Sequence, residues 1–201
     1  TMTPAQQKQT DLMEKAIEAA LSPGRFISYN AAWSFVEEVQ GVADDIVKII
    51  RKEPARAARL YEIFIAACHE KADEIDGSSG NFGMLVEGLF QGWIKARQGA
   101  NFDPDETAIS LISWMEDDPY GFCHDLERGV VKVLDKKGLA AFIQQIRAKF
   151  ESAPTRDDEE KRFSGYERRR WGGVLKTLLA AQRNVDAYIA LCGQTGLEAK
   201  D

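Results

Sequence analysis

Two Cys-His-acid tripeptides contain both histidines of the 201-residue chain: Cys68-His69-Glu70 and Cys123-His124-Asp125. Two thiolates and two imidazoles are a ligand set for tetrahedral zinc. Adjacent residues of a helix point about 100° apart, however, so a cysteine on an apolar stripe turns its histidine neighbour toward the flank. The C-x-x-C spacing of structural zinc sites is also missing. We therefore expect no metal or cofactor, two cysteines buried as small apolar residues, and histidines at the surface or in a groove.

The acidic run Glu116-Asp117-Asp118, close in sequence to His124, could support acid–base catalysis, because clustered carboxylates can separate their pKa values. Asp118 precedes Pro119, however, and Asp103 precedes Pro104, which is the pattern of a helix N-cap. No nucleophile motif, phosphate-binding loop or dinucleotide fingerprint accompanies these acids. The sequence therefore predicts no catalytic residue.

A basic patch lies between Tyr166 and Trp171, where Arg168, Arg169 and Arg170 stand between two aromatic residues. Such a patch could stack on bases or hold an acidic peptide. The acidic run 157–160 can neutralise it, and a net charge of −6 opposes nucleic-acid binding, which depends on clustered positive charge. We expect a solvated polar linker at 153–164, with an acidic protein partner as the alternative and nucleic acid the less favoured one.

The elements that must position these residues are helices. All six prolines fall where the apolar periodicity breaks, and no stretch alternates with a period of two. The apolar stripes predict about nine helices in one all-α domain, residues 1–201. Short connections favour antiparallel hairpins stacked into an α-solenoid of the tetratricopeptide or HEAT kind. A stripe of small residues at 88, 92 and 96 could let a neighbouring helix approach closely, or could be tolerated on an exposed face.

Bulk properties indicate a cytoplasmic protein. An apolar content of 44% is enough to bury a core. The longest apolar run, 63–68, is far shorter than the roughly 20 residues that span a bilayer, so we expect no membrane association. Three cysteines and the absence of an apolar leader segment favour a reducing compartment.

The run from Leu60 to Ala96, followed by D-P-D-E-T-A and by W-M-E-D-D-P-Y-G-F-C-H-D-L-E, resembles a bacterial domain family of unknown function. Members of this family look like tetratricopeptide or HEAT arrays, and related regions are found beside SWIM-type zinc fingers. The resemblance extends from about Phe26 to the C-terminus. It implies a helical-repeat fold and offers no catalytic residue. The ligand pattern of a SWIM finger is absent here, so no zinc or DNA role is implied.

Our main hypothesis is a non-catalytic helical scaffold that binds a protein or peptide, because helical arrays expose extended concave surfaces. Aromatic and arginine side chains are the usual anchors of interfaces. The rival hypotheses are a metal-dependent or acid–base enzyme using the two Cys-His pairs and Glu116, and a nucleic-acid-binding protein using the arginine patch. The interaction candidates are Trp33, Arg97, Trp114, Tyr120, Phe122, His124, Arg168, Arg169, Arg170 and Trp171.

Overall fold

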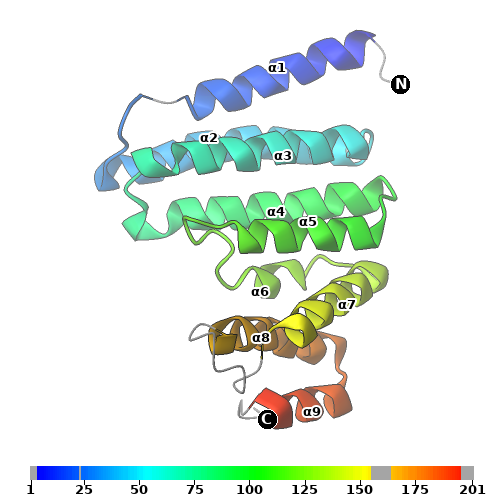
Figure 1. The fold of residues 1–201 in the computed structure, drawn as a ribbon. Coiled ribbons are helices and arrows are strands. Elements are labelled where there is room, and N and C mark those ends of the chain that lie inside the picture. Colours follow the sequence, from blue (N-terminus) through cyan, green and yellow to red (C-terminus); the bar gives the residue numbers. More distant parts are fainter. Residues whose placement is uncertain (1–3, 23, 155–163, 196–201) are drawn as a thin grey trace. The chain divides into compact units, whose positions relative to one another are not determined.

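The computed structural model describes residues 4–22, 24–154 and 164–195, and over these ranges the chain is helical, without a β-strand (Figure 1). The only pairing of β type among these residues is an isolated bridge between Ile27 and Ile75. The prediction of an all-α fold is therefore confirmed. The expected antiparallel hairpins and the solenoid remain predictions.

The described residues divide into two compact units. Unit 1 comprises residues 1–102 together with the short segment 118–123, and unit 2 comprises residues 103–117 and 124–201. Unit 1 contains the helices α1 (Pro4–Ala20), α2 (Tyr29–Ile50), α3 (Pro54–Lys71) and α4 (Asn81–Gly99), and the short 3-10 helices η1 (Ala72–Glu74) and η2 (Gly77–Ser79). Unit 2 contains α5 (Pro104–Glu116), α6 (Leu126–Val130), α7 (Lys136–Ser152), α8 (Ser164–Gln182) and α9 (Val185–Thr195).

Helix α3 is the centre of unit 1, because it packs against α1, α2 and α4 (Figure 1). Its apolar face is buried against the apolar face of α4, which is what an i, i+3, i+4 spacing of large side chains produces. The buried residues of these two helices include Leu60, Tyr61, Phe64, Ile65, Leu89, Phe90 and Trp93.

The small-residue stripe of α4 has two different environments. A Cβ added at Gly92 would lie 2.6 Å from the Oη of Tyr61, so the ring of α3 occupies the space that a side chain would need. Nothing lies within 4 Å of a Cβ added at Gly88, which is exposed. The close approach expected from the stripe thus exists at Gly92, and Gly88 is the tolerated, exposed glycine of the alternative.

In unit 2, α7 packs against α5 and α8, and α9 packs against α8. The large buried residues of α7 recur at helical spacing, as Phe142, Ile143, Ile146 and Phe150. Trp171 of α8 is 1% exposed. The core of this unit includes Leu111, Ile112, Phe142, Ile146, Trp171, Leu175 and Leu178.

The two Asp-Pro pairs have different structures. Asp103 caps α5 as predicted, with its carboxylate accepting the Asp105 N–H at 2.9 Å. The interpretation of Asp118 as the cap of a helix is wrong, because its carboxylate accepts the N–H groups of Phe122 and Cys123 at 2.9 and 2.7 Å in a turn. Gly121 and Asp125 in this turn have φ values of +75° and +57°, which no right-handed helix can continue.

The polar linker predicted at 153–164 falls almost entirely outside the described residues. Ala153 is buried and Pro154 is half-buried. Among the described helices, none combines the length and apolar character needed to cross a membrane.

Candidate functional site

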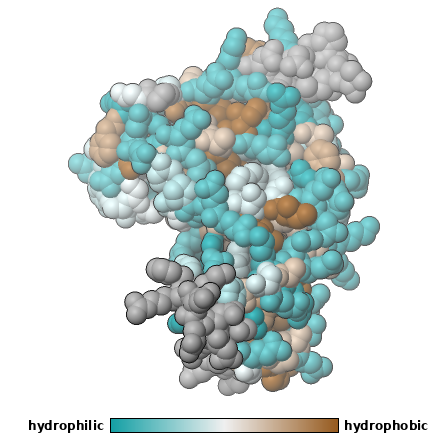
Figure 2. Space-filling model, viewed as in Figure 1, coloured by the Kyte–Doolittle hydropathy of each residue, from teal (hydrophilic) through white to brown (hydrophobic). Residues whose placement is uncertain are grey.

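A groove of about 520 Å³ lies between α2 and α4 of unit 1. Two large apolar side chains at its edge are open to solvent: Trp33 is 61% exposed and Met84 is 70% exposed. Figure 2 shows that on the viewed face hydrophobic residues form small groups within a mainly hydrophilic surface. What distinguishes these two exposed apolar residues is that both line the same groove, which makes the groove a candidate binding surface. The lining residues are Trp33, Val36, Glu37, Gln40, Gly41, Asp44, Asn81, Met84 and Leu85.

Helical periodicity explains why α2 has a second, outward face. Its buried residues are Ala32, Val39, Ala43 and Ile46, which recur at helical spacing and face the core. The residues that line the groove recur at the same spacing on the neighbouring face, from Trp33 to Asp44. Gly41 contributes no side chain to this face, and nothing lies within 4 Å of a Cβ added there. The groove is therefore open at the middle of α2.

The groove is acidic. Glu37 and Asp44 are its only charged lining residues among those the structure describes, and Asp44 accepts a hydrogen bond from Gln40 Nε2 at 2.9 Å. Tyr61 lies buried nearby, and its burial, followed by the charge of Asp44, raises its pKa to about 12. Glu37 and Asp44 are both exposed, so their carboxylates are accessible from solvent on the groove side.

A second cluster in unit 1 is aromatic and includes Tyr120 and Phe122. The ring of Phe122 meets His69 edge-on at a centroid distance of 5.1 Å and Phe82 at 5.6 Å. The hydroxyl of Tyr120 donates to Asp73 Oδ2 at 2.9 Å, which raises the Tyr120 pKa. These contacts hold the segment 118–123 against α3 and α4, so both predicted interface aromatics serve the packing of unit 1, with Tyr120 still 40% exposed.

The cysteines of the two Cys-His pairs are buried as expected, whereas only one of the two histidines lies at the surface. Cys68 and Cys123 are buried, and burial raises the pKa of the Cys68 thiol, which favours the unreactive neutral form. The half-buried His69 has its Nδ1 2.9 Å from the Ile65 carbonyl, and His124 is exposed. Among the described residues, no three His, Cys, Asp or Glu side chains are grouped as metal ligands would be.

The predicted arginine patch of unit 2 is largely engaged within the fold. Arg168 lies 4.2 Å above the Phe150 ring and donates to the Phe150 carbonyl at 3.0 Å. Arg170 donates to the Met115 carbonyl and lies over the ring of Trp171, which is itself buried. Arg169 is exposed and donates to the Gly165 carbonyl of its own helix. Trp171 is therefore a core residue that offers no surface to a partner.

The remaining predicted anchors lie in separate environments. Arg97 of unit 1 lies between the rings of Trp93 and Phe102, at 5.0 and 4.7 Å, and forms an ion pair with Glu62. Trp114 is half-buried in unit 2. Glu116, named in the enzyme hypothesis, forms a 2.6 Å ion pair with Lys149. Of the predicted interaction residues, only Trp33 lines the groove.

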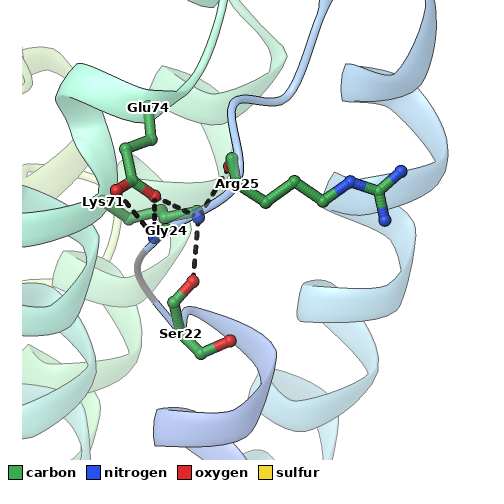
Figure 3. Close-up of polar contacts among 5 residues, drawn as sticks. All are labelled: Ser22, Gly24, Arg25, Lys71 and Glu74. Carbon is green, nitrogen blue, oxygen red and sulfur yellow. Dashed lines mark hydrogen bonds and ion pairs between the residues drawn. The ribbon is translucent and has the colours of Figure 1, made fainter.

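Sequence reasoning did not single out Lys71, which, like Arg56, is a buried cation of unit 1. Its ammonium donates to the carbonyls of Ser22 and Arg25 at 2.8 and 3.1 Å and to Glu74 at 2.5 Å (Figure 3). Glu74 in turn accepts the Gly24 N–H at 2.8 and 3.0 Å. These contacts, chiefly that with Lys71, lower the Glu74 pKa. All three donors of Lys71 have acceptors, so the residue joins the α1–α2 connection to the end of α3 and is not a reactive lysine.

Glu37, Asp44 and Met84 were also missed, although the sequence carried a signal for the two acids. Helix α2 contains Glu37, Glu38, Asp44 and Asp45 with no basic residue before Lys48. Met84 carried no signal, because a methionine at helical spacing is more often a core residue.

A family model described as a family of unknown function, DUF6880, matches residues 5–200. No curated protein and no solved structure matches the chain.

Proposed function

Because this chain belongs to the DUF6880 family, whose function is unknown, we propose its role from the geometry alone: it is a non-catalytic helical scaffold that binds a protein or peptide in the α2–α4 groove. The observation that carries this proposal is the exposure of Trp33 and Met84 at the edge of one groove. Tryptophan is enriched among residues that dominate binding energy, and methionine adapts its shape to different partners.

The groove supports binding better than catalysis. Its polar lining residues are two carboxylates, one glutamine and one asparagine, without a histidine, cysteine, serine or lysine to act as nucleophile or proton carrier among the described residues. The Cys-His pairs of the enzyme hypothesis do not line it. The arginine patch supports nucleic-acid binding less, since two of its arginines contact carbonyls and rings of unit 2.

Photo-crosslinking tests the proposal. A benzophenone amino acid is incorporated at position 84 in one protein and at position 166 in another, because Tyr166 is 67% exposed and belongs to unit 2. We expect position 84 to capture a defined protein from native extract. Trp33→Ala should abolish that adduct and leave any adduct at position 166 unchanged. Adducts at position 84 that persist with Trp33→Ala would contradict the proposal.

The scaffold proposal has two further parts, which concern the arrangement of the helices and the cellular location. We propose that the helices stack as hairpins in an α-solenoid, which is supported by the succession of helices along the chain. We also propose a cytoplasmic location, which is supported by three cysteines without a disulfide among them.

A further inference from the structure

The two helices that form the groove carry negative charge and no positive charge along the whole length that faces it. From residue 29 to residue 47, α2 contains Glu37, Glu38, Asp44 and Asp45 and no lysine or arginine. From residue 81 to residue 94, α4 contains Glu87 and no lysine or arginine. A surface of one sign raises the local concentration of ligands of the opposite sign. The charge of this groove therefore selects a cationic partner.

The fold leaves the carboxylates of the groove available. Asp45 pairs with Lys48 at 2.6 Å, and Glu87 accepts a hydrogen bond from Gln91 at 3.1 Å. Glu37 and Asp44, which line the groove, form no ion pair with any described residue. Asp44 accepts a hydrogen bond from the neutral Gln40 amide, and Lys48, which is paired with Asp45, is the cation that acts on Asp44 at longer range. The two acids that face the groove can thus accept new charged partners.

The dimensions of the groove suit a helix. On α2 the lining residues extend from Trp33 to Asp44, which is roughly 16 Å along the helix axis, or three turns. Trp33 and Met84 are its exposed apolar contacts, and Glu37 and Asp44 stand about two turns apart. An amphipathic helix laid between two helices presents apolar residues at i, i+3, i+4 and i+7, with charged residues on its flanks.

We propose that the occupant of the α2–α4 groove is a cationic amphipathic helix of another protein, with apolar residues against Trp33 and Met84 and lysine or arginine against Glu37 and Asp44. This inference rests on the proposed binding function and adds the chemistry of the partner. A second copy of this chain is the less favoured occupant, because the charge of the chain is −6 and its basic helix α8 buries its own apolar face.

Two designed probes test the inference. Both are fluorescently labelled 16-residue amphipathic helices with the same leucine and phenylalanine face; one carries lysine at the flanking positions and the other carries glutamate. Binding to the full chain is measured by fluorescence anisotropy at low salt. We expect the lysine helix to bind at least about tenfold more tightly than the glutamate helix, and this difference should shrink as salt is raised.

Two matched double variants test whether the acids that line the groove bind the lysine helix. Glu37→Gln with Asp44→Asn removes the two acids that line the groove, and Glu38→Gln with Asp45→Asn removes two neighbours on the same helix that do not. Both double variants change the net charge equally. We expect the first to weaken binding of the lysine helix about fivefold to tenfold and the second to weaken it about twofold or less. Equal losses from the two double variants would overturn the inference.

The results of these experiments distinguish a failure of the cationic-partner inference from a failure of the proposed binding function. If the two probes bind equally and Trp33→Ala abolishes both, the groove is a binding site and the cationic partner is overturned. If neither probe binds, the cationic partner is overturned, and crosslinking at position 84 still decides the binding function on its own. A crosslink at position 84 to a second copy of the chain would overturn the inference in favour of self-association.

Discussion

At the scale of single residues, the clearest structural device is the Lys71–Glu74 pair with the backbone of the α1–α2 connection. Lys71 is 2% exposed at its side chain and Glu74 is 29% exposed. A buried ammonium needs acceptors for all its protons, and here two carbonyls and a carboxylate supply them. The pair therefore contributes to the folding of unit 1 and not to a reaction.

The lowered pKa of Glu74 predicts a dependence of stability on pH. Because the folded-state pKa lies below the usual 4.5, this group stabilises the fold above that value, and the contribution is lost as the pH falls through the folded-state pKa. We expect Glu74→Gln to lower the thermal unfolding midpoint at pH 7 and to have a smaller effect at pH 3, which lies below the usual pKa of 4.5. Circular dichroism melts at both pH values provide the measurement.

The control for this prediction is Glu70→Gln, on the last turns of α3, where the carboxylate is exposed. Its midpoint should stay near that of the parent protein at both pH values. An equal effect of Glu74→Gln at pH 7 and pH 3 would show that the pair does not act through charge.

At the scale of elements, α4 shows how the same residue type has two roles on one helix. Gly92 lets Tyr61 of α3 pack against the backbone of α4, and Gly88, one turn earlier, faces solvent. The i, i+4 spacing is visible in the sequence. Which of the two glycines lies under a neighbouring ring depends on how α3 and α4 pack.

The two glycines give opposite predictions for the same substitution. Gly92→Ala would place a Cβ 2.6 Å from the Tyr61 hydroxyl oxygen and should destabilise the fold by about 1–3 kcal/mol through overpacking. Gly88→Ala meets no atom and should stabilise it by about 0.5–1 kcal/mol, because alanine favours the helix. Urea unfolding of both variants measures the two effects. A loss at Gly88 as large as that at Gly92 would contradict this description of the packing.

The turn before α6 shows where reasoning from capping patterns failed. Both Asp-Pro pairs predict a helix start, and only Asp103 has one. The Asp118 carboxylate accepts the N–H groups of Phe122 and Cys123, and the ring of Phe122 packs on His69 and Phe82. Local propensity favoured a helix, and the tertiary contacts of the segment stabilised a turn instead.

At the scale of the whole molecule, the charge distribution favours a cationic partner over nucleic acid. The net charge is −6, and the densest basic stretch has Arg168 and Arg170 engaged within unit 2. We expect the protein to pass through a heparin column at about 50 mM salt, where proteins that make many phosphate contacts are retained.

The variant Arg169→Ala is the control for the heparin experiment, since Arg169 is the exposed arginine of that stretch. Elution should not change in this variant. Retention that falls steeply with salt and is weakened by Arg169→Ala would instead support the nucleic-acid hypothesis.

The sequence by itself determined the all-α class and most helix positions, because proline placement and apolar periodicity are local properties of the chain. It also determined that Cys68 and Cys123 are buried, since both lie on apolar stripes. Only the tertiary structure decided which of the large apolar side chains remain exposed to solvent. Trp33 and Trp171 both belong to helices with apolar periodicity. Trp33 lines an open groove, and Trp171 is buried in the core of unit 2. Exposure depends on what a helix face packs against, and that is set by residues far apart in the chain.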